Sequence, residues 1–139
     1  MKRMKFFIAG ILSLIIIASA NVFAQDDIRK KQVKFEKGAA GATIKDQLKG
    51  YEIVDYLLGA KDGQSMTVIL ETDNPSNYYN VTAPGADTSM FIGSTSGNRF
   101  KGKLLKSGDY TVRVYLMRNA ARRGETANYT INFSIAGDE

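Results

Sequence analysis

The chain of 139 residues contains neither histidine nor cysteine, and this excludes several kinds of active site. Without histidine there is no Ser-His-Asp triad and no imidazole to transfer protons. Without cysteine there are no thiol nucleophiles, zinc–thiolate sites or disulfide bonds. The glycine-rich phosphate-binding motifs of nucleotide enzymes are missing as well. These absences argue against an enzyme and leave the fold to be stabilised by packing.

Acidic residues offer the remaining route to catalysis, because glycosidases need only two carboxylates. The candidate pairs are Asp26 with Asp27, Glu52 with Asp55, and Glu71 with Asp73. In a regular strand Glu52 and Asp55 point to opposite faces, and Glu71 and Asp73 flank a turn, so solvated strand ends explain all three pairs. The acidic residues do not have the spacing of a calcium-binding loop. We therefore expect no catalytic residue, no cofactor and no metal site.

The N-terminal region has the pattern of a secretory signal peptide. A basic start precedes an apolar run over residues 6–18, and small residues then lead to a cleavage site after Ala24. The apolar run is shorter than the roughly 20 residues that a transmembrane helix needs. We predict a signal peptide over 1–24 and a single domain over 25–139. The expected location is the periplasm, with no membrane anchor.

Positive charge is concentrated in one part of the chain. The segment 99–123 holds eight basic residues against Asp109 as its one acidic residue. The whole exported part, 25–139, is nearly balanced, with sixteen basic and fourteen acidic residues. Such a local asymmetry favours an acidic partner, whereas a solvated basic edge strand is the alternative. The export signal and the small net charge argue against a nucleic-acid partner.

Alternation of apolar and polar residues dominates the exported part and indicates β-strands. The alternation is clearest over 110–116 and 129–135. Turn residues separate the runs at intervals of about 8–12 residues, and no helical stripe lies between them. We predict an all-β fold, an antiparallel β-sandwich of about seven or eight strands, in preference to a barrel. The weaker runs are 33–35, 51–58, 66–70, 78–81, 90–92 and 100–105.

An arginine-rich loop over 117–127 joins the two clearest strands. It is long for a hairpin, and extra loop length in a compact domain is often functional. Arg118 and Arg122 are four residues apart, so one helical turn would aim both guanidinium groups the same way. In a solvated bend, Arg123, alone or together with Arg122, would instead pair with Glu125 or with water, and such exposed pairs contribute about 0–1 kcal/mol. Spacing alone therefore leaves two interpretations, a binding loop and an ordinary bend.

Arg113 and Tyr115 lie on the outer face of the strand that precedes this loop. Together they could form a mixed apolar and basic patch that binds a protein. Alternatively, the tyrosine ring packs beneath a neighbouring arginine stem and has only a structural role. The sequence supports both interpretations equally.

Five motifs of the chain resemble the periplasmic inhibitors of goose-type (g-type) lysozyme. In order along the chain they are KGAAG, LKGYE, AKDGQ, SGDYTVRV and RNAAR. AKDGQ and SGDYTVRV also look like bacterial β-sandwich modules of the pre-peptidase C-terminal type. The discriminating combination is the R-N-x-A-R loop together with Gly50-Tyr51 upstream. The resemblance runs from about Lys31 to Ala136.

This resemblance implies a β-sandwich that blocks the substrate cleft of g-type lysozyme with exposed side chains. Carried over to this sequence, the side chains are Tyr51, Arg118 and Arg122. Asn119 belongs to the same motif, and Arg123 extends it in a supporting role. The expected partner is therefore g-type lysozyme, a protein, and the expected function is inhibition that protects peptidoglycan.

Two other functions fit the same residues. A periplasmic anionic-glycan-binding module of the pre-peptidase C-terminal type would use the basic segment, and its binding would depend steeply on salt. An envelope-associated β-sandwich with merely solvated arginines would bind no lysozyme, and shortening its loop would leave its function unaltered.

Overall fold

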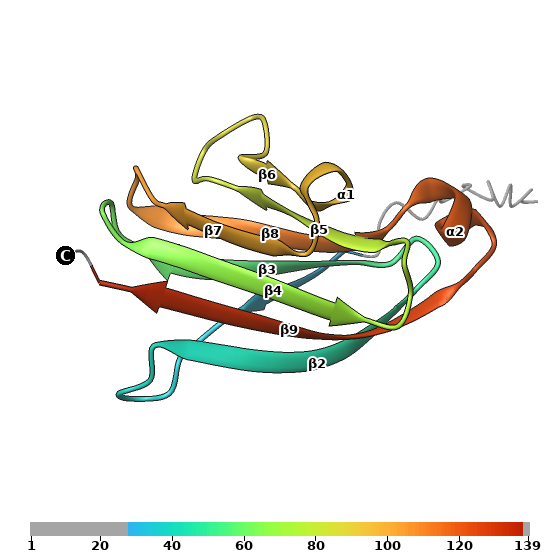
Figure 1. The fold of residues 1–139 in the computed structure, drawn as a ribbon, viewed down its shortest axis with the longest axis horizontal. Coiled ribbons are helices and arrows are strands. Elements are labelled where there is room, and N and C mark those ends of the chain that lie inside the picture. The colour runs from blue at the N-terminus through green and yellow to red at the C-terminus, as the bar shows by residue number, and fades with distance from the viewer. Residues whose placement is uncertain (1–27, 138–139) are drawn as a thin grey trace, which may run out of the picture.

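The computed structural model describes residues 28–137, which form a sandwich of two β-sheets (Figure 1). The five-stranded sheet has the order β1-β3-β8-β5-β6, and the four-stranded sheet has the order β2-β9-β4-β7. The predicted all-β sandwich is confirmed, whereas the predicted signal peptide lies outside the described residues. The elements are β1 (Ile28–Gln32), β2 (Gly41–Lys49), β3 (Ile53–Ala60), β4 (Ser65–Thr72), β5 (Asn77–Thr82), β6 (Phe91–Ile92), α1 (Gly93–Ser96), β7 (Arg99–Lys103), β8 (Gly108–Leu116), α2 (Arg118–Arg122) and β9 (Thr126–Ala136).

Residues 28–137 contain nine strands rather than seven or eight, and the difference lies near the N-terminus. The sequence pattern misses β2, in which Leu48 is the only fully buried residue. Asp46 lies on the inward-facing side of this strand, so a charge interrupts the apolar alternation. Its carboxylate forms ion pairs with Arg29 and Lys31, each at 3.2 Å. The expected strand over 33–35 is also displaced, because β1 occupies the preceding residues.

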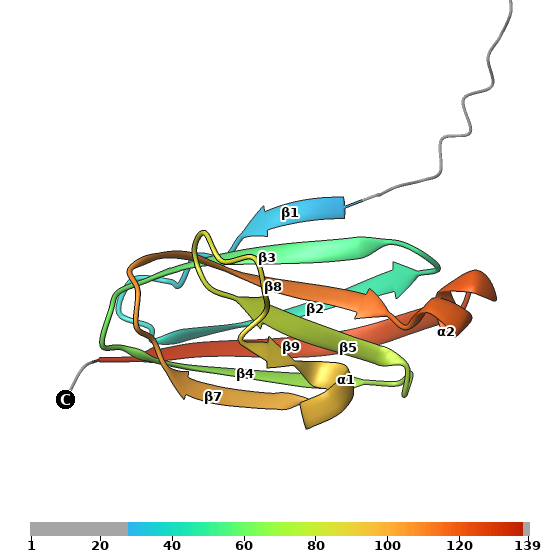
Figure 2. The ribbon, with the colours of Figure 1, turned by 90° about the horizontal axis from the view of Figure 1, so that it is seen from above.

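β1 is the edge strand of the five-stranded sheet, beside β3 (Figure 2). Its pairing with β3 is parallel, whereas the other recorded strand pairs are antiparallel. Val33 follows β1, is buried, and donates its N–H to the Leu57 carbonyl at 2.9 Å. Within residues 28–137, none of the helices has the length and apolar character needed to cross a membrane.

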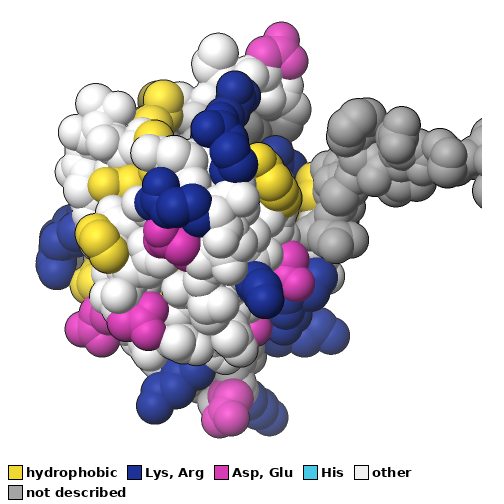
Figure 3. Space-filling model, turned by 90° about the vertical axis from the view of Figure 1, so that its right-hand side faces the viewer, with side chains coloured by type: hydrophobic (Ala, Val, Ile, Leu, Met, Phe, Trp, Pro, Cys, Tyr) yellow, Lys and Arg dark blue, Asp and Glu magenta, His cyan; other side chains and the backbone are white. Residues whose placement is uncertain are grey.

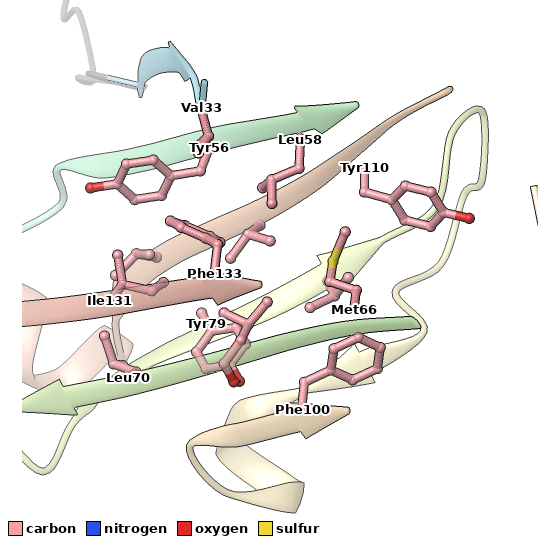
Figure 4. Close-up of a cluster of buried hydrophobic side chains, with 14 of the residues drawn as sticks. Val33, Tyr56, Leu58, Met66, Leu70, Tyr79, Phe100, Tyr110, Ile131 and Phe133 are labelled. Carbon is pink, nitrogen blue, oxygen red and sulfur yellow. The ribbon is translucent and has the colours of Figure 1, made fainter. Parts of the chain in front are cut away.

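The core lies between the sheets and consists of alternate residues of the strands (Figure 4). Tyr110 and Val114 of β8 are buried, as are Ile131 and Phe133 of β9, which confirms the alternation in both runs. The rings of Tyr56 and Phe133 pack with their centroids 5.3 Å apart. Burial of each large apolar side chain contributes about 1.5–3 kcal/mol, so packing can replace the missing disulfides.

Three buried tyrosines carry their hydroxyl groups into this core, and each hydroxyl has a partner. The Tyr56 and Tyr129 hydroxyls hydrogen-bond to each other at 2.8 Å, and the Tyr79 hydroxyl donates to the Val68 carbonyl. Burial raises the pKa of Tyr56 to about 12 and also raises the pKa of Tyr79 and of Tyr129. All three hydroxyls therefore stay protonated to a higher pH than an ordinary tyrosine does.

The loop between β8 and β9 crosses from one sheet to the other. β8 pairs with β3 and β5, whereas β9 pairs with β2 and β4. The loop is therefore not the long hairpin that adjacency of these strands would have produced. Its length has a structural reason, because packed sheets lie about 10 Å apart and the chain must span that gap.

Candidate functional site

Three connections between the sheets meet at one end of the sandwich, which we call the α2 end (right in Figure 1). They are residues 50–52 between β2 and β3, 73–76 between β4 and β5, and 117–125 between β8 and β9. Strands β2 and β9 are antiparallel neighbours, with Lys49 opposite Thr126. The turn that follows β2 is therefore placed beside the loop that precedes β9.

Hydrogen bonds join these three connections to one another. The Gly50 N–H donates to the Glu125 carbonyl at 2.9 Å, and the Met117 N–H donates to the Ser76 carbonyl at 2.9 Å. The side chain of Asn74, which is buried, donates to the Glu125 carboxylate at 3.0 Å. The α2 end is thus a bonded unit rather than three independent loops.

The RNAAR motif forms the short helix α2. Ala120 and Ala121 are buried and pack with Leu116 and Ala127 in a small apolar cluster. The two alanines therefore attach the helix to the sandwich. Their burial leaves the longer polar side chains of α2 on the outside.

The C-terminal end of α2 is closed by Gly124. The Gly124 N–H donates to the Ala121 carbonyl at 2.9 Å, and the Glu125 N–H donates to the Ala120 carbonyl at 3.1 Å. This pair of bonds is a Schellman motif, which requires a left-handed residue after the helix. Gly124 supplies it with a φ of 70°, and the chain then turns directly into β9.

Tyr51 projects from the tip of the turn between β2 and β3. The pattern predicted a strand from residue 51, but β3 begins at Ile53, so Tyr51 lies in the turn. Gly50 has a φ of 62°, and the Glu52 carboxylate accepts the Lys49 N–H at 2.9 Å, which closes the turn. As a result Tyr51 is 54% exposed.

The three arginines of the motif have different surroundings. Arg118 and Arg122 are exposed, and neither forms an ion pair within residues 28–137. Arg123 lies 2.7 Å from the Glu125 carboxylate, as the solvated-bend interpretation expected for this residue. Hydrogen bonds from Asn74 and then from Arg123 hold the pKa of Glu125 below its usual value. Arg123 therefore stabilises the loop, while the other two arginines face solvent.

Tyr51 and Arg118 line the same groove, which has a volume of about 450 Å³. Arg113 and Tyr115 belong to its lining as well, whereas Arg122 does not. Figure 3 looks onto this end, where basic side chains project beside hydrophobic ones. The structure thus joins the Tyr51 turn to the start of α2 and adds outer-face residues of β8. The exposed Asn119 lies on α2 between the two solvent-facing arginines but does not line the groove.

Arg113 and Tyr115 are fixed on the outer face of the five-stranded sheet. Arg113 donates to the Asp55 carboxylate through Nε at 2.7 Å and through Nη2 at 2.8 Å. This bidentate contact raises the pKa of Arg113. The Tyr115 hydroxyl donates to the Asn80 side chain at 3.2 Å. The contact between Asn80 and Tyr115 could not be predicted from the sequence, because it depends on the pairing of β5 with β8.

Three carboxylates considered for catalysis, those of Glu52, Asp55 and Asp73, form structural contacts, whereas Asp26 and Asp27 lie outside the described residues. Asp55 is bound by Arg113, and Glu52 closes the Tyr51 turn. Asp73 accepts the backbone N–H and the side chain of Asn128, each at 2.8 Å, and these bonds lower its pKa. Among residues 28–137, no three potential metal-ligating side chains come together.

Comparison with solved structures and with sequences of known proteins places this chain in a family. The crystal structure of Aeromonas hydrophila PliG, a periplasmic lysozyme inhibitor of g-type lysozyme, is 36% identical, with a TM-score of 0.72 over 78% of this chain and 97% of that one. This chain belongs to the periplasmic inhibitors of g-type lysozyme. Salmonella Typhimurium PliG is 26% identical, with a TM-score of 0.62 over 77% of this chain and 97% of that one.

Sequence comparison adds a relative from Escherichia coli (strain K12), an inhibitor of g-type lysozyme. It is 29% identical over 129 residues, which are 91% of this chain and 93% of that protein. No family model matches the sequence. Family membership confirms the resemblance to the periplasmic inhibitors of g-type lysozyme. The individual roles of Tyr51, Arg118, Arg122, Asn119 and Arg123 stay predictions.

Proposed function

We propose that this protein is exported to the periplasm and inhibits g-type lysozyme by inserting Tyr51, Arg118 and Arg122 into the substrate cleft. The observation that carries this proposal is the meeting of the Tyr51 turn and α2 at one exposed end of the sandwich. The relatives are inhibitors of g-type lysozyme, which identifies the partner. Occlusion of a cleft needs no catalytic group, and this suits a chain without histidine and cysteine.

Charge complementarity supports the assignment of the two arginines. Lysozymes cleave glycosidic bonds with acidic residues in a groove shaped for polysaccharide. A guanidinium group offers a planar fork that matches a carboxylate through two hydrogen bonds, and it stays charged at any working pH. Since neither Arg118 nor Arg122 has an acidic partner within residues 28–137, both charges can be directed to the cleft.

The environment of Tyr51 supports its assignment as the third inserted group. Tyrosine combines a rigid apolar ring with a polar tip, and with arginine it is enriched among the residues that dominate binding energy. The Tyr51 turn is bonded to Glu125 in the loop that carries α2. Because this bond joins the turn to the loop before binding, less conformational entropy is lost when the complex forms.

Binding of an anionic glycan is the alternative function, and strand β7 offers one observation in its favour. Arg99, Lys101 and Lys103 are exposed at alternate positions of this edge strand. A polyanion held by such exposed charges would dissociate steeply with salt, because salt screens exposed charges. A shape-matched complex in a cleft would keep much of its affinity at high salt.

Capture and inhibition of goose-type, chicken-type and invertebrate-type lysozymes test the proposal. We expect the exported protein to bind and inhibit the goose-type enzyme at both low and high salt, and to leave the other two enzymes active. Peptidoglycan and lipopolysaccharide serve as competing ligands in the same titrations. The alternative would be established if the protein bound none of the three lysozymes but bound these glycans, with an affinity that falls steeply at high salt.

A further inference from the structure

The groove beside Tyr51 extends the α2 end onto the outer face of the five-stranded sheet. The proposed function uses two of its residues, Tyr51 and Arg118, and leaves the remainder without a role. The groove is concave and about 450 Å³ in volume, which is enough to receive a side chain of a partner protein. Its principal lining residues are Tyr51, Ile53, Arg113, Tyr115, Leu116 and Arg118.

Ile53 and Tyr115 form an apolar floor in this groove. β3 and β8 are antiparallel, with the buried Val54 opposite the buried Val114, so the outward neighbours Ile53 and Tyr115 lie side by side. Both are half-buried and present part of their side chains to the groove. Tyr78 of β5 lies opposite Tyr115 in the same row but does not line the groove.

Hydrogen bonds hold the groove in a fixed shape. Arg113 is tied to Asp55, whose residue exposure is only 4%, by two bonds of 2.7 and 2.8 Å. The Tyr115 hydroxyl donates to Asn80 at 3.2 Å, and the Tyr115 carbonyl accepts the Asn77 side chain at 3.0 Å. Because the groove is already ordered, little conformational entropy is lost when a partner binds in it.

Arg118, which forms no ion pair within residues 28–137, places a positive charge beside the apolar floor of the groove. Arg113 and Arg118 contribute two guanidinium groups, and Glu52 is the one acidic residue of the lining. Asp55 neutralises Arg113. The chemistry that fits is an apolar side chain with a carboxylate next to it.

We infer that this groove is a second contact site for g-type lysozyme, and that it receives an apolar side chain with a neighbouring carboxylate from the surface bordering the enzyme's cleft. The inference rests on the proposed function, because insertion of α2 brings the groove against that border. Tyr51 and Arg118 belong to both contacts, so the two are continuous. Catalytic carboxylates are common to glycosidases, so contacts outside the cleft give the inhibitor a means of discrimination.

The variants Tyr115→Ala and Tyr78→Ala form a matched pair that tests this inference. Each removes one tyrosine from the same row of the same sheet face, but only Tyr115 lines the groove. We expect Tyr115→Ala to weaken binding to g-type lysozyme at least about tenfold, as loss of a tyrosine anchor does. Tyr78→Ala should stay within about threefold of the parent. Circular dichroism verifies that both variants are folded, and Ile53→Ala provides the test if Tyr115→Ala is not.

The double variant Arg118→Ala/Arg122→Ala, titrated in parallel, separates two kinds of failure. If the folded groove variants bind like the parent while the arginine variant loses binding, the groove inference is wrong and the proposed function stands. Equal losses for Tyr115→Ala and Tyr78→Ala would also overturn the inference, because they would reflect a general change of the sheet. If the parent itself does not bind the lysozyme, the proposed function fails and the groove inference fails with it.

Discussion

Arg118, Arg122 and Arg123 are the same residue type within one short segment, yet their contacts separate their roles. Arg123 donates through Nε to the Glu125 carboxylate at 2.8 Å and so contributes to the loop's own structure. Arg118 and Arg122 face solvent and form no ion pair within residues 28–137. Exposed cations that do not serve the fold are the groups expected to serve a partner.

Replacing either solvent-facing arginine should affect binding and leave folding nearly unchanged. We predict that Arg118→Ala or Arg122→Ala weakens binding to g-type lysozyme by about 2–5 kcal/mol, because a cleft carboxylate loses its buried partner. The free energy of unfolding should change by less than about 0.5 kcal/mol, as is usual for exposed substitutions. Isothermal titration calorimetry and urea denaturation measure the two quantities. A variant that binds normally would remove that arginine from the interface.

Arg123→Ala serves as the internal comparison for these variants. We predict a loss of binding below about 1 kcal/mol, because the guanidinium group is engaged in an exposed pair with Glu125. The same titration against g-type lysozyme checks this value. If Arg123→Ala weakens binding as much as Arg118→Ala does, then Arg123 leaves Glu125 in the complex and joins the interface.

At the scale of elements, α2 is oriented by its small residues rather than by its arginines. Ala120 and Ala121 attach one side of the helix to Leu116 and Ala127, and Gly124 ends it. A helix of five residues would be unstable in isolation, since formation of the first turn is unfavourable. The direction of the arginines is therefore a property of the loop as packed on the sandwich.

Replacing Gly124 tests this dependence. Gly124→Ala places a Cβ at a φ of 70° and should destabilise the fold by about 1–2 kcal/mol, although nothing lies within 4 Å of the added atom. Gly85→Ala is the matched control, because Gly85 has a φ of 71°, equally open surroundings and a place in the loop between β5 and β6. We predict similar losses of stability in urea but weaker lysozyme binding only for Gly124→Ala. Equal binding by the two variants would show that the end of α2 does not orient the arginines.

The sequence predicts some of these elements well because their local pattern is strong. β8 and β9 alternate without interruption, so one face of each was recognisable as core. β2 was missed because the charged Asp46 lies on its inward row and is compensated by Arg29 and Lys31, which belong to another strand. Alternation along a strand cannot reveal that a neighbouring strand neutralises an inward charge.

The same limit applies to the candidate site. RNAAR and Gly50-Tyr51 were recognisable as motifs, and the resemblance implied that they act together, but their spacing in the sequence did not explain how they meet. They meet because β2 and β9 are neighbours, which places Lys49 opposite Thr126. The role of Asn80 beside Tyr115 likewise follows from the pairing of β5 with β8. Strand order is set by packing of the whole sandwich, so it had to come from the structure.

For the whole molecule, stability resides in the core between the sheets, while the candidate binding groups lie at one end. Because the hydroxyls of Tyr56, Tyr79 and Tyr129 are buried, the stability of this core depends on pH. Burial raises the pKa of Tyr56 from 10.0 to about 12, because the fold favours its neutral form. This contribution to stability is fully present below pH 10 and is lost as the pH rises through about 12.

We therefore predict alkaline unfolding that coincides with ionisation of the buried tyrosines. Ultraviolet absorbance of tyrosinate and far-ultraviolet circular dichroism, recorded in one titration, follow the two events. The last tyrosines should ionise above pH 10 and together with loss of the β-sheet signal. Complete tyrosine ionisation near pH 10 with the sheet signal intact would contradict this prediction.

Inhibition of a g-type lysozyme by the Arg118→Ala/Arg122→Ala double variant tests the central claim most directly. Both substitutions lie on the exposed side of α2, so the variant should fold like the parent, as circular dichroism can verify. We predict that the parent inhibits the enzyme and that the folded double variant does not, because the cleft no longer receives a cationic group. Full inhibition by the folded double variant would contradict the assignment of α2 as the element that blocks the cleft.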